Sequence, residues 1–456
     1  MSAEGLLKAQ DKMRAEGVDT AAIDVFTHYY GELEAGATGL IPEETITPLL
    51  DPTKLADVDV SADEASEALR RTAIIKLNGG LGTSMGMDRA KSLLPVRDGK
   101  SFLDIIAEQV SHARTQHDAP LPLVLMNSFR TRVDSLEALA AHPGIEVDGL
   151  PLDFLQNKEP KVRVDNLEPV EWPADPSLEW CPPGHGDIYT ALLASGVLKA
   201  LLDAGYKYAS ASNSDNLGAV PSPEIAGWFA ASGAPYAAEL CRRTPADRKG
   251  GHLAIRTADE QLILRDTAQT PPDQMHYFTD EHRHPYFHTN NLWFNLEALY
   301  AALTESGAVL GLPLIRNKKT VDPTDSSSPE VFQIESAMGA AIEVFEGATA
   351  IAIERERFLP VKTTNDLLLL RSDAYRLDPD SGLRLDVQNA PLVDLDSAYF
   401  KTMTKFDARF PHGAPSLREA SSFTVRGDWT FGADVVVRGD VTLEGSGHVA
   451  DGTVLS

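Results

Sequence analysis

The sequence has few cysteines and no long hydrophobic run, and each absence excludes a class of protein. Two cysteines occur in 456 residues, Cys181 and Cys241, and they are not spaced as a CxxC pair. A disulfide framework and a cysteine-based zinc site are therefore not expected. No run of about 18 apolar residues is present to span a membrane, and the amino terminus lacks the apolar core of a signal peptide. The sequence predicts a cytoplasmic protein.

Positive charge is also scarce. The chain has 41 Lys and Arg residues against 67 Asp and Glu residues, which gives a formal net charge of -26 at pH 7. This balance argues against nucleic acid or an anionic membrane as a partner, because either would require a basic surface. A polyanionic ligand must then be met by a few lysines, backbone N–H groups and a metal ion, so individual lysine positions become informative.

What is present is typical of a large α/β protein. Hydrophobic residues make up 43% of the chain, and 456 residues suffice for two or three domains. Apolar residues recur at helical spacing up to about residue 39, and short β-rich runs alternate with helical ones up to about residue 370. This alternation predicts a mostly parallel or mixed sheet. We expect an N-terminal helical segment over 1–65, an α/β domain over 66–385 and a distinct C-terminal region over 386–456.

The C-terminal region has a six-residue period. Its apolar members are Val425, Phe431, Val437, Leu443 and Val449. A strict hexad is typical of a parallel β-helix, in which short strands form successive sides of a coil. A small antiparallel hairpin pair is the alternative, but it has no reason to keep a six-residue period. We therefore predict a short β-helix.

The first motif that carries chemistry is a glycine-rich loop after an apolar run. It reads IKLNGGLGTSMGMDRAKS over 75–92, with four glycines in eight residues and Lys91 five residues beyond the last of them. It fits neither the P-loop nor the GxGxxG fingerprint. Consecutive glycines let the backbone approach a flat base or a phosphate chain. A tight turn between strand and helix is the alternative, but one or two glycines would suffice for it.

Three further motifs follow along the chain. The stretch WCPPGHGDIY places His185 between two glycines, where a ligand contact is favoured over the structural role usual for a lone histidine. The stretch YKYASASNSDNLG reads as a strand that delivers Asp215 at its carboxyl end, either as a Mg²⁺ ligand or as part of an Asx turn. The stretch RFLPVKTTNDLL offers Lys362, either as a second phosphate-binding lysine or as an ordinary surface residue.

Together these stretches closely resemble the eukaryotic-type UTP–glucose-1-phosphate uridylyltransferases, also called UDP-glucose pyrophosphorylases. The matching words lie between residues 76 and 370 and keep the order of the family; they include KLNGGLGTSMG, LMNSFRT, PPGHGDIY, SNSDNLGA, TPADRKGG, TNNLWFNLEAL and FLPVKTTNDLLLL. The resemblance implies a Rossmann-like nucleotidyltransferase core with a mixed sheet and a short left-handed parallel β-helix. It also implies the reversible reaction of UTP with glucose 1-phosphate to give UDP-glucose and pyrophosphate, with Mg²⁺ as cofactor.

The resemblance also implies roles for individual residues. The residues expected to bind UTP are Leu77, Asn78, Gly79, Gly80, Lys91, Gln156, Gly184, Asp215 and Lys362. Those expected on the sugar-phosphate side are His185, Asn213, Ser214 and Asn290. Asp215 matches the metal ligand, and Lys362 and Lys91 match the lysines that neutralise charge during catalysis. Lys249 and Lys319 lie in family words without a definite role, and the oligomeric state is left open.

The sequence departs from the family pattern at three places. Ala90 stands where the family usually has proline, Leu155 and Asn157 flank Gln156 with different residues, and His288 replaces an asparagine. The last change bears on sugar contacts, so an enzyme that prefers galactose 1-phosphate or N-acetylglucosamine 1-phosphate is an alternative. A catalytically silent nucleotide-sugar binding protein is a further one, although the complete set of Asp215, Lys91 and Lys362 argues against it.

Overall fold

A mixed eight-stranded sheet forms the centre of the computed structural model, which describes residues 2–244, 247–248 and 250–456. The strands in spatial order are β2 (Thr53–Lys54), β18 (Thr349–Ile353), β12 (Tyr236–Arg242), β15 (Tyr286–Asn295), β11 (Tyr208–Asn213), β3 (Thr72–Asn78), β6 (Leu123–Asn127) and β7 (Asp153–Leu155). Only β15 runs antiparallel to its neighbours in this sheet. The prediction of a mixed α/β sheet is confirmed.

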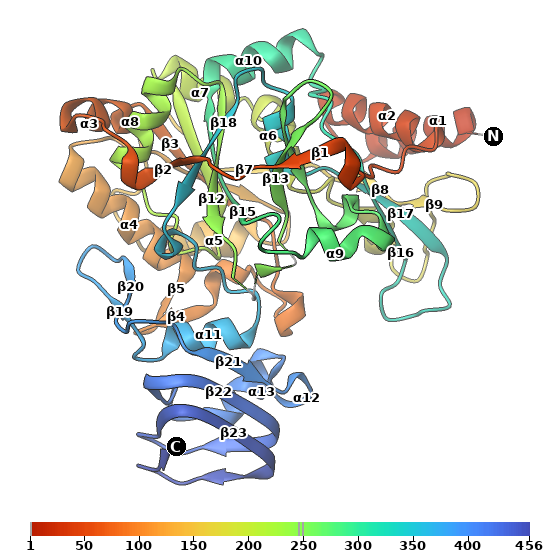
Figure 1. The fold of residues 1–456 in the computed structure, drawn as a ribbon. Coiled ribbons are helices and arrows are strands. Elements are labelled where there is room, and N and C mark those ends of the chain that lie inside the picture. The colour runs from red at the N-terminus through yellow and green to blue at the C-terminus, as the bar shows by residue number, and fades with distance from the viewer. Residues whose placement is uncertain (1, 245–246, 249) are drawn as a thin grey trace.

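Helices cover both faces of this sheet (Figure 1). The helices of the described part of the chain are α1 (Ser2–Ala15), α2 (Thr20–Glu34), α3 (Ala62–Arg70), α4 (Phe102–His117), α5 (Arg132–Leu139), α6 (Ile188–Ala194), α7 (Val197–Asp203), α8 (Pro223–Ser232), α9 (Met275–Phe278), α10 (Leu296–Glu305), α11 (Thr364–Arg371), α12 (Ser397–Phe400) and α13 (Met403–Arg409). Of these, α12 and α13 lie beside the C-terminal strands rather than on the central sheet. None of the helices in the described part of the chain has the length and apolar character needed to cross a membrane.

Strand β3 shows why both faces need cover. Because successive side chains of a strand point to opposite faces, Ile74 joins the core formed with α3, α4 and α8, whereas Ala73 and Ile75 join the core formed with α2, α6 and α10. All three are almost fully buried. A strand buried on both faces reads as a continuous apolar run, which is the pattern that precedes the glycine-rich loop.

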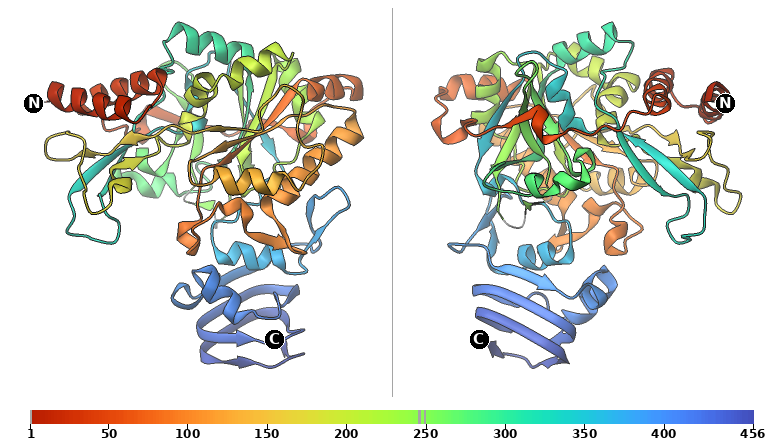
Figure 2. Two further views of the ribbon diagram at one scale, coloured as in Figure 1. Left: turned by 180° about the vertical axis from the view of Figure 1, so that it is seen from behind. Right: turned by 45° about the vertical axis from the view of Figure 1, so that its right-hand side comes forward.

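Smaller sheets surround the central one. They contain β1 (Ile46–Pro48), β13 (His252–Arg256) and β14 (Leu262–Arg265); β16 (Ile315–Thr320), β17 (Glu330–Glu335) and β9 (Val162–Arg163); β8 (Glu159–Pro160) and β10 (Trp180–Cys181); β4 (Pro95–Arg97) and β5 (Lys100–Ser101); and β19 (Tyr375–Leu377) and β20 (Leu383–Leu385). The β16–β17 hairpin projects from the same side of the molecule as the N-terminal helices (Figure 2).

The C-terminal region forms a four-stranded sheet in which every pairing is parallel. Its strands are β21 (Leu392–Leu395), β22 (Ser416–Phe431), β23 (Val436–Val449) and β24 (Val454–Leu455). Val425 pairs with Leu443 and Phe431 with Val449, so the chain returns to the same position after three hexads. Parallel pairing excludes the antiparallel hairpin alternative. Figure 1 shows this sheet, in blue, beneath the central eight-stranded sheet and next to α11.

Candidate active site

The glycine-rich loop meets Gln156 directly after β3. A Cβ at Gly79 would lie 2.5 Å from Gln156 Oε1, so any residue other than glycine would displace the end of that side chain. Gln156 is held in place because its backbone N–H donates to the Asn127 carbonyl oxygen at 2.8 Å. Two residues that the sequence placed at a nucleoside site, 77 positions apart in the chain, are therefore in contact.

The side chain of Asn78 has a structural role and points away from the site. Its side chain is 2% exposed, and Nδ2 donates to Asn127 Oδ1 and to Ser135 Oγ at 2.7 Å each. This amide joins β3 to β6 and α5, so Asn78 offers a ligand its backbone rather than its side chain.

Lys91 joins three segments that are far apart in the sequence. Its backbone N–H donates to the Gly80 carbonyl oxygen at 3.0 Å. Its Nζ lies 2.6 Å from Asp215 Oδ2 and also donates to the Val361 carbonyl oxygen. Both side chains of the ion pair are less than one-fifth exposed. The glycine-rich loop, the turn after β11 and the segment before Lys362 therefore converge on one ammonium group.

Asp215 has one carboxylate oxygen to spare. It follows the carboxyl end of β11, where ligands bind in open α/β sheets. Oδ1 is buried and has no hydrogen-bond partner among the residues that the structure describes. No group of three His, Cys, Asp or Glu side chains in the described ranges is arranged to hold a metal ion by itself. Asp215 therefore fits an ion such as Mg²⁺, which takes one or two carboxylates and completes its shell with phosphates and water.

A cavity of about 400 Å³ opens beside Asp215. The residues that line it are Asn213, Asp215, Asp247, Gly250, Gly251, Leu264, Asp266, Phe287, His288, Thr289, Asn290, Phe358, Pro360 and Lys362. It brings together four predicted site residues: Asn213, Asp215, Asn290 and Lys362. Lys91, Gly79, Gly80, Gln156, Gly184 and His185 are not among its walls.

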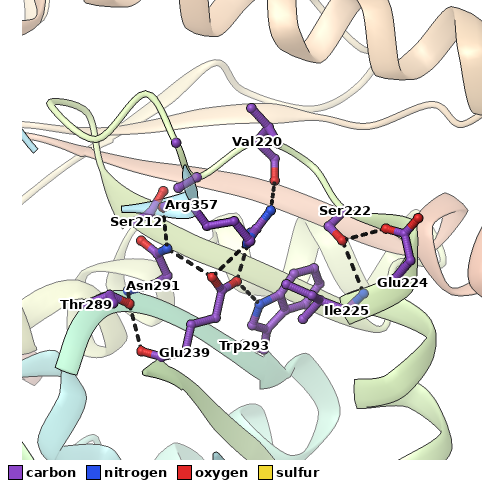
Figure 3. A network of polar contacts seen from close by, with 12 residues as sticks. Ser212, Val220, Ser222, Glu224, Ile225, Glu239, Thr289, Asn291, Trp293 and Arg357 are labelled. Atoms are coloured by element: carbon purple, nitrogen blue, oxygen red, sulfur yellow. Dashed lines mark hydrogen bonds and ion pairs between the residues drawn. The ribbon is translucent and has the colours of Figure 1, made fainter. Parts of the chain in front are cut away.

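The segment Arg357–Lys362, called the Lys362 strap below, is anchored from underneath. The Arg357 guanidinium binds the Glu239 carboxylate with two N···O distances of 3.0 Å, and the two side chains are 12% and 1% exposed. The same carboxylate accepts from Trp293 Nε1 at 2.9 Å and from Asn291 Nδ2 at 3.0 Å, as Figure 3 shows. These bonds outweigh desolvation and lower the pKa of Glu239, so the ion pair persists.

The far end of the Lys362 strap is tied to the turn after β11. The Leu359 N–H donates to Asn216 Oδ1 at 2.8 Å, and the Val361 N–H donates to the Asp215 carbonyl oxygen at 3.3 Å. Lys362 is exposed and is one of the residues that line the cavity. The strap therefore holds an ammonium group and the Asp215 carboxylate on the same cavity.

Lys76, which sequence reasoning missed, fastens the same turn from below. It is 2% exposed, and Nζ donates to Ser212 Oγ at 2.8 Å and to the Ala219 carbonyl oxygen at 2.9 Å. Burial, and next the nearby Arg357 charge, lower its pKa to about 7. The sequence did contain a signal for Lys76, because a lysine within an apolar run, two residues before Asn78, is unusual.

Gly184 and His185 lie against the segment after β17. Gly184 has a φ of +80°, and a Cβ there would lie 2.5 Å from the Ser336 carbonyl oxygen. His185 Nδ1 accepts from the Met338 N–H at 2.9 Å. Burial lowers the pKa of His185, so the imidazole is neutral, and its proton is on Nε2. His185 is thus a hydrogen-bond donor rather than a base.

Neither of the two remaining lysines from the sequence motifs, Lys319 and Lys249, can be placed at the cavity. Lys319 lies on β16, where its exposed Nζ donates to Gln333 Oε1 at 2.8 Å on the projecting hairpin. Lys249 lies outside the described residues. Asp247, Gly250 and Gly251, which sequence reasoning did not single out, line the cavity instead. They belong to the TPADRKGG motif, so that motif already indicated that this segment lies near the site.

Comparisons with known proteins agree on one family. The sequence pattern of the family described as UTP–glucose-1-phosphate uridylyltransferase matches residues 24–438. The Saccharomyces cerevisiae protein of that name is 40% identical over 388 residues, which cover 84% of this chain and 76% of the relative. The one from Hordeum vulgare is 35% identical, over 99% and 95% of the two chains.

Solved structures give the same result. A mutant of UDP-glucose pyrophosphorylase from Leishmania major, in complex with UDP-Glc, is 42% identical and superposes with a TM-score of 0.93 over 99% of this chain and 98% of that one. A crystal structure of UDP-glucose phosphorylase from Trypanosoma brucei is 42% identical, with a TM-score of 0.90 over 99% of each chain.

Proposed function

Because the chain belongs to the UTP–glucose-1-phosphate uridylyltransferase family, we propose that its reaction takes place at the cavity between Asp215 and Lys362. The enzyme joins UTP and glucose 1-phosphate to give UDP-glucose and pyrophosphate. The observation that carries the assignment to this cavity is the convergence of Lys91, Asp215 and the Lys362 strap. Two anionic substrates need such local positive charge on a chain whose net charge is -26.

The substrates divide the site between them. The nucleoside of UTP lies over Leu77–Gly80, with Gln156 and Gly184 as further contacts, and its phosphates extend toward Lys91 and Lys362. The contact between Gly79 and Gln156 supports this assignment. The sugar phosphate takes the side lined by Asn213 and Asn290. Ser214 and His185 are the other residues on that side, and His185 Nε2 is a donor for an oxygen of the sugar phosphate.

The chemistry is a direct in-line displacement. A phosphate oxygen of glucose 1-phosphate forms a bond to the α-phosphorus of UTP, the bond from that phosphorus to the bridging oxygen breaks, and pyrophosphate leaves. The attacking phosphate is already anionic at neutral pH, so no general base is needed. The protein aligns two anions and neutralises their charge, and Lys91 and Lys362 supply ammonium groups for this purpose.

Asp215 is the residue that would hold Mg²⁺. Its partnerless Oδ1 supports this assignment, and its Oδ2 stays paired with Lys91. When bound, the ion would offset the charge of the phosphate oxygens. Asp215 itself fixes the turn after β11, because the Val361 N–H donates to its carbonyl oxygen.

The stereochemistry at phosphorus tests the displacement. The substrate is UTP that carries sulfur on the α-phosphorus in one known configuration. A single in-line attack yields a UDP-glucose analogue with the inverted configuration at that phosphorus, and ³¹P NMR of the product distinguishes inversion from retention. Retention would mean two displacements through a covalent uridylyl-enzyme. That result would contradict the proposed mechanism and call for a nucleophilic side chain at the cavity.

Three assignments concern the chain outside the site. We infer that residues 416–456 form the start of a left-handed parallel β-helix, supported by the return of the chain after three hexads. The division into 1–65, a Rossmann-like nucleotidyltransferase core over 66–385, and 386–456 is part of the same proposal. A cytoplasmic location is supported by Cys181 and Cys241, which are both free and buried.

A further inference from the structure

A bulge in β15 turns one side chain into the cavity. Ala238 of β12 pairs with Leu292, whereas Leu240 pairs with His288, so three residues of β15 stand opposite Glu239 alone. Asn290 lies in the middle of the bulge with a φ of +60°, a left-handed conformation that asparagine tolerates better than most residues. Bulges near active sites redirect side chains in this way, and Asn290 accordingly lines the cavity.

His288 lies behind Asn290 and contacts it twice. Its side chain is nine-tenths buried, and its Nδ1 accepts from the Asn290 backbone N–H at 3.2 Å. Asn290 Oδ1 lies 3.0 Å from the same Nδ1. On its other side, the His288 ring rests on Gly339, where a Cβ would come within 2.5 Å of Cε1. The ring is thus fixed between a glycine and the bulge.

The backbone contact favours one tautomer of His288 and one orientation of the Asn290 amide. Nδ1 accepts from a backbone N–H that cannot turn away, which places the ring proton on Nε2, a buried atom with no hydrogen-bond partner among the described residues. Burial, together with the nearby His185, lowers the pKa of His288 to about 4, so the ring is neutral at physiological pH. An amide oxygen facing the lone pair of Nδ1 is repelled. A half-turn of the amide replaces Oδ1 with Nδ2 at the same position without steric change.

From this arrangement we propose that His288 is a positioning residue that turns the Asn290 amide oxygen toward the cavity, where it accepts a hydrogen bond from one hydroxyl group of the sugar. The inference rests on the proposed function, since the sugar phosphate must occupy this cavity. Asparagine is the conservative replacement at position 288, because asparagine Oδ1 and histidine Nδ1 are both attached to Cγ and each side chain can present an acceptor to Asn290 from the same place.

The test compares wild-type enzyme with three variants of one position. His288→Asn keeps an acceptor on Cγ, His288→Gln moves it one bond farther out, and His288→Leu removes it. Each purified enzyme is assayed for kcat and KM with glucose 1-phosphate and with analogues that lack one ring hydroxyl each. Circular dichroism and thermal unfolding establish that each variant is folded. His288→Gln serves as the second loss variant if His288→Leu does not fold.

We expect one deoxy analogue to lose about 10- to 100-fold in kcat/KM with the wild-type enzyme. His288→Leu and His288→Gln should reduce that discrimination to below about threefold, and His288→Asn should keep most of it. The KM for UTP should stay at the wild-type value throughout, which a general loss of structure would not allow.

Two failures are distinguishable. If the wild-type enzyme fails to release pyrophosphate whichever sugar phosphate is supplied, the proposed function is wrong, and this inference is wrong with it. If wild-type enzyme is active and His288→Leu discriminates among the analogues as wild type does, the function stands and the positioning role of His288 is wrong. Equal loss of activity toward every analogue in His288→Leu, with the discrimination intact, would also overturn it.

Discussion

At the scale of single residues, the central prediction concerns Lys362. Its ammonium group lies in the cavity wall and has no ion-pair partner among the described residues, so it is available to a phosphate. We expect Lys362→Ala to keep UTP binding but to lose about 10²- to 10³-fold in kcat, as removal of one charge-stabilising donor does in other enzymes. Isothermal titration with UTP and steady-state kinetics measure the two effects separately.

Lys319→Ala is the matched control for Lys362→Ala. It makes the same substitution on the projecting β16–β17 hairpin, outside the cavity. We expect it to leave kcat within about twofold of wild type, because surface substitutions away from a site have small effects. A Lys362→Ala enzyme as active as the Lys319→Ala control would remove Lys362 from the chemistry.

Lys76 gives a prediction about pH. Its pKa is about 7 in the folded protein and near 10.5 when unperturbed. Between these values the unfolded chain binds a proton that the folded chain has lost, so raising the pH favours the folded state. From about pH 7 to about pH 9.5, urea unfolding should show the stability of wild type rising relative to that of Lys76→Met. Parallel pH profiles of the two proteins would show that Lys76 is not a titrating group in this range.

Single residues also show where sequence reasoning ends. Motifs singled out Asp215 and Lys91 as candidates, and Asp215 follows the carboxyl end of a strand as expected. The ion pair between them spans 124 positions and depends on how the strands are ordered in the sheet. Likewise, nothing in the local sequence indicated that the side chain of Asn78 faces α5, because a strand's register decides which face each residue takes.

At the scale of elements, the Lys362 strap depends on its buried anchor. Glu239→Gln leaves the Arg357 charge buried without a counter-ion, and Arg357→Met does the same to the Glu239 carboxylate. Removal of one partner of a buried pair typically costs about 3–5 kcal/mol. We expect each single variant to lose stability of this order in urea unfolding, and kcat to fall because the strap is no longer held.

The double variant separates charge from packing. In Glu239→Gln/Arg357→Met no unpaired charge remains, so its loss of stability should be smaller than the sum of the two single losses. Strict additivity would mean that the two side chains stabilise the strap independently, and the account of the anchor would be wrong.

Elements were predicted with mixed success. The alternation of apolar runs gave the mixed sheet, and the hexads gave parallel strands at the carboxyl end, because both patterns follow directly from how side chains alternate or repeat. The bulge in β15 and the projecting β16–β17 hairpin were not predicted. They depend on pairing between distant strands, which leaves little trace in a local pattern.

At the scale of the whole molecule, one hydrophobic core joins the catalytic sheet to the C-terminal strands. It runs from residues under β3 and α4 through α13 to buried positions of β22 and β23. At the C-terminal end of this core, Phe410 after α13 stacks on Phe431 of β22 with ring centroids 4.8 Å apart. Because the two parts share one core, we expect them to unfold together, even though the sequence places them in separate regions.

We therefore expect one cooperative thermal transition. Calorimetric and van't Hoff enthalpies should agree, provided unfolding is reversible. Phe410→Ala should destabilise by about 3–5 kcal/mol, as is typical for a buried phenylalanine, and should lower that single transition without splitting it. Two resolved transitions in the wild-type protein would show that the C-terminal strands unfold independently of the catalytic sheet.

The most direct test of the account is pyrophosphate release by the purified chain with UTP, glucose 1-phosphate and Mg²⁺. We predict release that requires all three, that fails when CTP or ATP replaces UTP, and that stops when EDTA removes the metal. Such a result would show that the chain transfers a uridylyl group to glucose 1-phosphate with the help of a metal ion, as the proposed function requires. Release without glucose 1-phosphate, or no release with any sugar phosphate, would contradict the account.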